Sequence, residues 1–332
     1  MSLNLEFFNR PTNITAKAVC DSVSEQGIRL TTFEIEYPRF IHGELMTHRM
    51  LSKNSSSSRA IPIQKMLDQI ESNIALPVYW GKNKSGMQAV EEIDKASIRS
   101  AIDQWGFAYG DAKHVVNRMV ELGLHKQVPN RLTEPFQMMK VVITGTDWDN
   151  FFNLRIHPDA QPEICMLAYK MYQAMQESTP YELKEGEWHL PYVSIGWNGK
   201  GEMCYADEDF NSIELEEAIK LSAASCASVS YRTEGMTLEK ADKIFDMLIK
   251  AEVIHASPFE HLATPVGRMQ GGLGVKRINC SESVTWEDGV THMNKQGELC
   301  SGNLRGWIQY RHLLPNNTNW EFDFEERMKL FK

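Results

Sequence analysis

The sequence lacks the features of a membrane, secreted or nucleic-acid-coating protein. No apolar run reaches the roughly 20 residues that a transmembrane helix needs, and the N-terminus has no basic segment followed by an apolar one. Positive charge is in the minority, because 35 Lys and Arg face 44 Asp and Glu, a formal net charge of -9. A nonspecific binder of nucleic acid or anionic membrane would need a basic face. We therefore expect a cytoplasmic protein that binds neither.

The cysteine and glycine patterns exclude further kinds of site. The six cysteines form no Cys-x-x-Cys pair and have no histidine at zinc spacing, so we predict neither disulfides nor a metal site, but buried, reduced thiols. The glycines at 269–274 follow no strand that leads into a Gly-x-Gly-x-x-Gly turn. They are interpreted as a turn rather than as a Rossmann dinucleotide site.

What is present is the composition of an ordinary globular protein, with 332 residues, 42% hydrophobic and 24% charged. Residues 28–37 alternate and are rich in β-branched and aromatic side chains, which predicts a strand; residues 138–143 predict a strand or a buried helix. Helical periodicity covers 62–74, 87–122, 158–177, 211–224 and 237–252. The predicted fold class is α+β, with long helices packed on a small antiparallel sheet.

The most informative segment is 48–59, which places two arginines and a row of hydroxyls around a short loop. Residues 40–47 have helical spacing, so the serine run is expected to leave a helix end. Hydroxyls there can donate to phosphate oxygens while Arg59 holds them in a bidentate fork. The alternative is a flexible serine-rich linker. We favour a phosphate-binding loop, because a linker seldom lies between two arginines and runs straight into an apolar segment.

The same segment resembles the signature of the flavin-dependent thymidylate synthases, which reads Arg-His-Arg, then Ser, Asn-Glu and Ser-x-Arg. The matching residues here are His48, Arg49, Ser52, Asn54, Ser57 and Arg59. Three positions depart from the family pattern: Thr47 replaces the leading arginine, Ser55 replaces the glutamate, and Glu44 stands where the family usually has glutamine.

Four further elements resemble the same family. Residues 150–164 resemble its Asn-Phe-x-x-Leu-Arg and Ala-Gln-x-Glu-Ile run, and residues 131–135 its Arg-x-x-x-Pro element. Residues 255–261 are similar to its His-x-Thr/Ser-Pro-Phe-Glu-His element, and residues 226–231 stand where it has a Val-Ser-Phe flavin contact. The resemblance therefore extends through most of the chain.

The resemblance implies flavin-dependent methylation of dUMP at C5 to dTMP, with FAD as cofactor and with methylene-tetrahydrofolate and NADPH as co-substrates. It implies that Arg155 is catalytic, because it would hold the pyrimidine and stabilise negative charge on the ring. The implied substrate-binding residues are Glu44, Ser57, Ser58, Arg59, Arg131 and Arg155. The implied cofactor-binding residues are His48, Arg49, Asn54, Asn150, Ser230, His255, Ser257 and Glu260. Each also has a structural alternative, as a helix cap, a turn residue or part of the core.

The three departures leave the exact reaction open. They fall where family members contact nucleotide and flavin, so the pyrimidine or the transferred group could differ. One alternative is hydroxymethylation, or methylation of another pyrimidine deoxynucleotide such as dCMP. Another is a non-catalytic nucleotide-binding subunit.

The order of the motifs is also unusual, since the family places the element at 255–261 before the signature rather than after it. Cys20–Ser24 and Cys226–Ser230 match at four of five positions, which suggests two diverged half-copies of one fold; chance similarity is the alternative. We accordingly predict a nucleotide-binding half (1–180), a linker (181–210) and a flavin-binding half (211–332). One chain would then hold what two subunits supply elsewhere, and we predict a homodimer.

Overall fold

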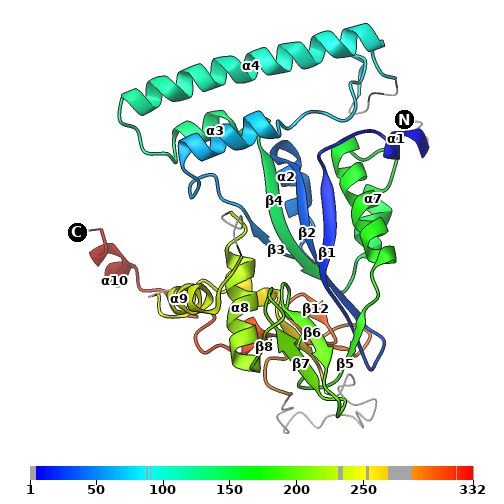
Figure 1. Cartoon of the computed structure of the whole chain (residues 1–332), viewed down its shortest axis with the longest axis vertical. Coiled ribbons are helices and arrows are strands. Elements are labelled where there is room, and N and C mark those ends of the chain that lie inside the picture. The colour runs from blue at the N-terminus through cyan, green and yellow to red at the C-terminus, as the bar shows by residue number, and fades with distance from the viewer. Residues whose placement is uncertain are drawn as a thin grey trace.

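The computed structural model describes residues 5–86, 89, 91–230, 235–251, 254–267, 286–318 and 320–331. A sheet forms the middle of the molecule, with α3 and α4 at one end and α8, α9 and several short strands at the other (Figure 1). In the described part, this sheet has the order β3-β4-β2-β1-β5. Its strands are β1 (Thr15–Ser24), β2 (Arg29–Pro38), β3 (Ser52–Ser55), β4 (Met138–Gly145) and β5 (Tyr181–Leu183).

Neighbouring strands of the sheet are antiparallel, except that β5 runs parallel to β1. The strand predicted at 28–37 is β2, and the segment left open at 138–143 is the strand β4. The mixed α/β architecture with small sheets is thus confirmed.

The two faces of the sheet differ in chemistry. Alternate residues of β2, such as Phe33, Ile35 and Tyr37, are fully buried in one core with three helices. These are α2 (His42–Met46), α6 (Asp149–Arg155) and α7 (Pro162–Glu177). The residues between them point to the other face, because side chains alternate along a strand. That face is polar: Thr32 pairs in register with Thr144, and Glu36 with Lys140.

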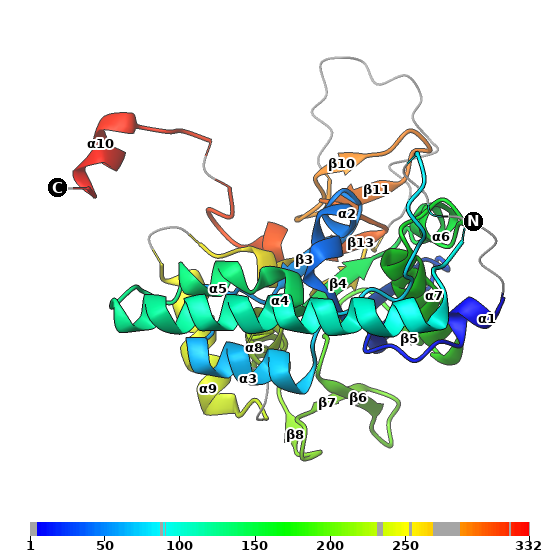
Figure 2. The ribbon, with the colours of Figure 1, turned by 90° about the horizontal axis from the view of Figure 1, so that it is seen from above.

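At the upper end, α3 (Ile63–Ser72) and α4 (Lys95–Glu121) form a separate apolar cluster with Phe136, and α5 (Pro129–Leu132) lies beside both helices. Figure 2 shows α4 running alongside α3 and α5, which lie on either side of it. The helix predicted from residue 87 begins only at 95, because Asp94 caps it by accepting from two backbone N–H groups. Residues 87, 88 and 90 lie outside the described part of the chain.

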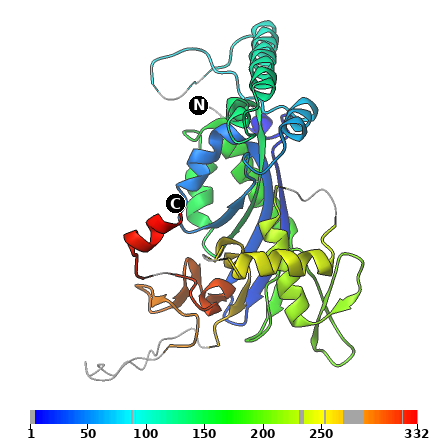
Figure 3. The ribbon, with the colours of Figure 1, turned by 90° about the vertical axis from the view of Figure 1, so that its left-hand side faces the viewer.

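The C-terminal half contains α8 (Leu215–Ala227) and α9 (Leu238–Ile249), which pack together in a second core. Figure 3 shows α9 lying across this half of the molecule. Short strands complete it in three small sheets: β6 (Ser194–Trp197), β7 (Met203–Ala206) and β8 (Ser212–Ile213); β9 (Ala263–Pro265) with β13 (Trp307–Gln309); and β10 (His292–Met293), β11 (Leu299–Ser301) and β12 (Leu304–Arg305).

Short helical elements complete the described chain. The α-helices among them are α1 (Leu5–Phe8) and α10 (Phe324–Lys329). The 3-10 helices are η1 (Arg39–Ile41), η2 (Glu134–Phe136), η3 (Ser257–Glu260) and η4 (Tyr310–Leu313). No described helix is both long and apolar enough to cross a membrane.

The segment 181–210, predicted as a linker, is folded into the body of the protein. It contains β5, β6 and β7, and its residues Trp188, His189 and Leu190 are buried. The glycines of this segment suggested a flexible connection, but the buried side chains between them fix it to the sheet. The domain boundaries at 180 and 210 stay a prediction.

A buried hydrogen-bonded chain crosses the polar face of the sheet. His189 bonds to Ser22 through Nδ1 and to Thr32 through Nε2, each at 2.8 Å. Thr32 bonds to Thr144 at 2.7 Å, and Thr144 to Nδ1 of His261 at 2.7 Å. Burial lowers the pKa of both histidines to about 3, so both are neutral at neutral pH. The chain joins the 181–210 segment to the end of the 255–261 element.

Some predictions concern residues that are partly or wholly outside the described chain. The glycines at 269–274, Cys280 and Tyr231 all lie outside it. The described cysteines are free thiols. Cys165, Cys226 and Cys300 are buried as predicted, whereas Cys20 and Cys204 are partly exposed.

Candidate functional site

The signature segment follows a different course from the one predicted. Helix α2 ends at Met46, and the serine run starts inside strand β3 (Ser52–Ser55) rather than at a helix end. Between them the chain turns, and the Lys53 ammonium closes the turn by donating to the carbonyl oxygens of His48 and Leu51. Strand β3 pairs with β4 at the edge of the sheet. The loop at 56–60 therefore starts from a strand that is held in the sheet, and this argues against a flexible linker.

Four of the predicted residues, His48, Arg49, Asn150 and Arg155, line one hollow of about 370 Å³, named the His48 hollow. The Arg155 Nε–H donates to His48 Nε2 at 2.8 Å. Burial, and then the positive charge of Arg155, lowers the pKa of His48 to about 4. His48 is therefore a neutral acceptor, and it orients the guanidinium of Arg155, one of the two arginines that line this hollow.

Arg155 makes two further contacts from the same guanidinium. Its Nη2 lies 3.3 Å from the carbonyl oxygen of Glu44 and 3.3 Å from the Thr47 hydroxyl. Two positions that depart from the family pattern thus contact the predicted catalytic arginine. The Glu44 contact uses the backbone, so it does not depend on the side chain at that position.

The signature also contacts both elements that occur late in the sequence. Asn54 donates to the carbonyl oxygen of Cys226 at 2.6 Å and accepts from the Ser257 hydroxyl at 3.1 Å. The Ser57 backbone N–H donates to Ser230 Oγ at 2.8 Å. Segments about 170 to 200 residues apart in sequence therefore meet along one edge of the sheet.

The 255–261 element is held mainly by contacts at its far end. Glu260 forms an ion pair with Arg311, and its charge also faces Lys53. Burial lowers the pKa of Lys53 to about 8. His255, at the start of the element, is exposed, and its backbone N–H donates to the carbonyl oxygen of Leu248. The imidazole of His255 is thus accessible to a ligand, while Glu260 is bound within the protein.

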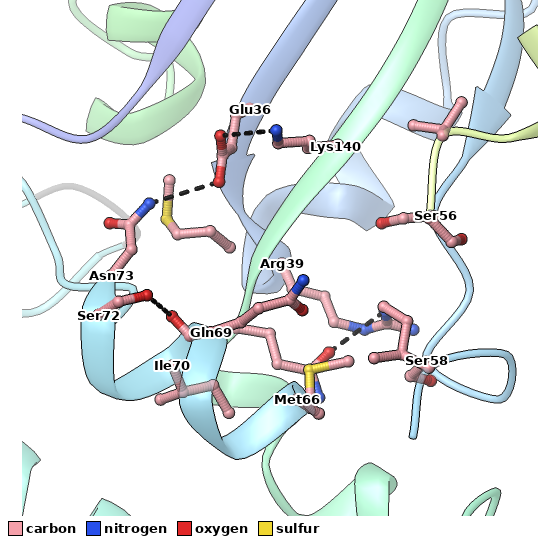
Figure 4. Close-up of a pocket in the computed structure, with 15 residues that line it drawn as sticks. Glu36, Arg39, Ser56, Ser58, Met66, Gln69, Ile70, Ser72, Asn73 and Lys140 are labelled. Atoms are coloured by element: carbon pink, nitrogen blue, oxygen red, sulfur yellow. Dashed lines mark hydrogen bonds and ion pairs between the residues drawn. The ribbon is translucent and has the colours of Figure 1, made fainter. Parts of the chain in front are cut away.

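Ser58 and Ser230 line a second hollow of about 220 Å³, named the Arg39 hollow (Figure 4). Its walls come from β2, β4, α3 and the loop after β3, together with Val229 and Ser230 at the end of α8. Arg39 forms an ion pair with Glu134 at 3.0 Å. Glu134 also accepts from the Ser58 hydroxyl at 3.2 Å and from Arg131 at 3.1 Å.

The structure thus separates the predicted residues into groups. Arg155 and Ser58 line different hollows. Arg59 is exposed and lines neither of them, and Arg131 is an exposed partner of Glu134. Sequence reasoning missed Arg39, Lys53 and Lys140. Lys53 lies inside the signature, whereas Arg39 and Lys140 come together only through strand pairing.

A match to a protein family supports a thymidylate synthase-like enzyme. Residues 28–181 match the family model of the thymidylate synthase complementing protein, Thy1. The match covers less than half of the chain, and it supports the resemblance to the flavin-dependent thymidylate synthases that the motifs carry. The match ends before the elements at 226–231 and 255–261.

Two solved structures are similar to part of the chain. Both are of the UMP/dUMP methylase PolB from Streptomyces cacaoi, one bound with 5-Br UMP and one with 5-Br dUMP. The first has 18% sequence identity and a TM-score of 0.43, and covers 49% of this chain and 89% of that one. The second has 17% identity and a TM-score of 0.42, and covers 49% of this chain and 90% of that one. No curated protein matches the sequence.

Proposed function

We propose that the protein methylates dUMP at C5 to give dTMP, with FAD as cofactor and with methylene-tetrahydrofolate and NAD(P)H as co-substrates. The family assignment of residues 28–181 supports this reaction class. The observation that carries the proposal for the whole chain is the set of contacts made by Asn54 and Ser57. They join the signature to Cys226, Ser230 and Ser257, so both late elements lie beside the phosphate loop.

In this proposal, Arg155 holds the carbonyl edge of the pyrimidine and stabilises negative charge that develops on the ring. Such preorganised stabilisation acts most strongly where water is excluded. His48 supports this role because, as a neutral acceptor, it fixes the guanidinium without cancelling its charge. Ser57, Ser58, Arg59 and Arg131 would hold the phosphate, so that binding energy remote from the ring orients it.

Some of the proposed flavin-binding residues can donate hydrogen bonds to the phosphates and ring carbonyls of FAD. Ser230 Oγ accepts from the Ser57 N–H, so its own hydroxyl proton remains free to donate to a ligand. In the 255–261 element the imidazole of His255 is exposed, and the exposed Ser257 hydroxyl, which donates to Asn54, can still accept from a ligand. Bound reduced flavin would supply the reducing equivalents of the reaction. His48, Arg49, Asn54, Asn150 and Glu260 complete the proposed set.

A second chain would complete the site in this proposal. Arg155 lines the His48 hollow and Ser58 the Arg39 hollow, so one chain presents the ring-binding and phosphate-binding groups in separate places. In a homodimer, one chain could present Arg155 to a nucleotide held by the loop of the other. Light scattering of the purified protein tests this assembly, and a monomer that is fully active would contradict it.

The unusual motif order is better explained by rearrangement than by duplication. The two similar pentapeptides adopt different structures, since Cys20–Ser24 lies in strand β1 and Cys226–Ser230 lies at the C-terminal end of helix α8. Two copies of one half-fold would place them in equivalent elements. We propose instead a single fold whose elements occur in a changed order, because the late elements pack against the signature as parts of one unit.

A different pyrimidine is a second candidate substrate, and one contact favours it. Thr47, which replaces the leading arginine of the family signature, lies 3.3 Å from Arg155. The replacement therefore alters the surroundings of the group proposed to hold the base, which suits another deoxynucleotide such as dCMP, or hydroxymethyl transfer. Turnover of dUMP and turnover of dCMP, both measured with this protein, decide between the two substrates. Turnover of neither would favour a non-catalytic nucleotide-binding subunit.

The broad class is tested by the absorption spectrum of the purified protein with and without dUMP. We expect a bound flavin band that the nucleotide perturbs. His255→Ala should weaken FAD binding while the far-UV circular dichroism stays unchanged, because this imidazole is exposed. His157→Ala, another exposed histidine, is the control. A wild-type protein that takes up no FAD at micromolar concentration would exclude the flavoenzyme.

A further inference from the structure

The Arg39 hollow contains charged groups that no motif assigns. Arg39, which follows β2, and Lys140, which lies on β4, both line it, close to Ser56 and Ser58 (Figure 4). The hollow measures about 220 Å³. That volume suits a phosphoryl group with part of the sugar or base attached to it, and it is too small for a complete dinucleotide.

The Arg39 guanidinium is desolvated and incompletely neutralised. Its side chain is only 17% exposed, and burial lowers its pKa. Its carboxylate partner Glu134 is shared with a second guanidinium, that of Arg131, and with the Ser58 hydroxyl. One carboxylate therefore serves two positive charges. A desolvated cation in this situation gains from a further anionic partner.

The opposite end of the hollow has a second cation with a weak partner. Lys140 lies 4.0 Å from Glu36, at the limit of an ion pair, and nearly half of its side chain is exposed. Glu36 also lines the hollow, and burial raises its pKa. The remaining lining groups include hydroxyls that can donate: the Ser230 hydroxyl accepts from the Ser57 N–H and keeps its proton, and Ser56 lies beside it.

We propose that the Arg39 hollow binds a phosphate group, with Arg39 and Lys140 as its cations and Ser56 and Ser230 as hydroxyl donors. The inference rests on the proposed function, in which both a nucleotide and FAD carry phosphate. The phosphate belongs to one of these two ligands. The apolar walls from Met66 and Ile70 then contact the uncharged part of the ligand next to the phosphate.

The test compares phosphorylated ligands with their unphosphorylated forms by calorimetry. We expect Arg39→Gln to weaken binding of dUMP, but not of deoxyuridine, by about tenfold or more if the nucleotide supplies the phosphate. If FAD supplies it, the same variant weakens FAD and leaves riboflavin unchanged. Lys140→Gln should act in the same direction, by a few-fold, because Lys140 is more exposed than Arg39.

Lys113→Gln is the matched control, because Lys113 also pairs with a glutamate, Glu71, but lies on α4 away from the hollow. Equal affinities of wild type, Arg39→Gln and Lys140→Gln for both phosphorylated ligands would overturn the proposal. Inorganic pyrophosphate separates this outcome from failure of the proposed function. If the wild-type protein binds pyrophosphate through Arg39 but binds neither dUMP nor FAD, the proposed phosphate site stands and the proposed enzymatic function is wrong.

Discussion

The His48 hollow and the Arg39 hollow lie on either side of the same signature, yet they are built in different ways. Among the described residues, the His48 hollow is lined by residues within 47–51 and 147–155, and both ranges lie in the N-terminal half of the chain. The Arg39 hollow needs β2, β4 and α3, and also Val229 and Ser230 from the far end of α8. One hollow is therefore built within the N-terminal half, and the other is assembled from both halves of the chain.

This difference shows which interactions each hollow depends on. The His48 hollow depends on one neutral histidine that holds one arginine. The Arg39 hollow depends on the long-range contacts of Asn54 and Ser57, and on the buried histidine chain that fixes the 255–261 element. Conditions or substitutions that break long-range contacts should therefore affect the Arg39 hollow first.

The largest expected effect is a loss of stability in acid. The pKa values of His189 and His261 are lowered to about 3, and that of His48 to about 4, from an ordinary value of 6.5. Between pH 6.5 and 4 the unfolded chain therefore binds protons that the folded chain does not, so the free energy of unfolding falls as the pH falls. The midpoint of urea unfolding, measured from pH 7 to 4.5, should decrease throughout this range.

A variant isolates the histidine contribution, because Glu36 and Glu163 have pKa values raised by burial and act in the opposite direction. His189→Gln keeps a side chain that can hydrogen-bond but removes one titrating group. Its unfolding midpoint should depend less on pH than that of the wild type. If the unfolding midpoint of both proteins depended equally on pH, protonation of His189 would not contribute to the loss of stability in acid.

The next effect concerns the long-range contacts. Asn54→Ala removes the hydrogen bonds to Cys226 and Ser257, and we expect it to lower the free energy of unfolding by about 1–3 kcal/mol. Asn150→Ala is the control, since Asn150 is exposed in the His48 hollow and should change stability by less than about 0.5 kcal/mol. Urea unfolding measures the free energy of unfolding of both variants. An equal decrease in the two would show that the hollows do not differ in their dependence on long-range contacts.

The local and long-range parts of the molecule also differ in how far the sequence predicted them. The strand at 28–37 was predicted because its alternation is regular. Strand β1 (Thr15–Ser24) was missed, because its polar and small residues show no such pattern. The 181–210 segment was predicted as a linker from its glycines, but its structure is decided by Trp188, His189 and Leu190 packing against distant strands.

The same holds for the site. The proximity of His48 and Arg155 follows from motifs that the chain shares with its family. Arg39 and Lys140 belong to no motif, and Lys140 reaches this hollow because the register of β2 and β4 pairs it with Glu36. A single sequence does not reveal that register. For the same reason the partner of Glu260, which is Arg311, could not be predicted.

A smaller effect distinguishes the electrostatics of the two hollows. Arg155 lowers the pKa of His48, and Arg39 lowers that of His42, in both cases after burial, which is the larger cause. Arg155→Gln should therefore raise the pKa of His48 part of the way toward 6.5 and leave His42 unchanged. Arg39→Gln should do the reverse. Histidine titrations by NMR measure both values, and a shift of both histidines in either variant would show that the two hollows are electrostatically coupled.

The smallest effect concerns Lys53, which lies between the hollows and closes the turn at 48–53. Its charge contributes to the lowered pKa of His48 and also to that of His42, in each case less than the neighbouring arginine does. Lys53→Met should therefore raise both pKa values, and each by less than the corresponding arginine variant. The control is Lys82→Met, because Lys82 is an exposed partner of Glu91 and should move neither histidine. If Lys53→Met raised only one of the two values, the signature would separate the hollows electrostatically, and Lys53 would belong to one of them alone.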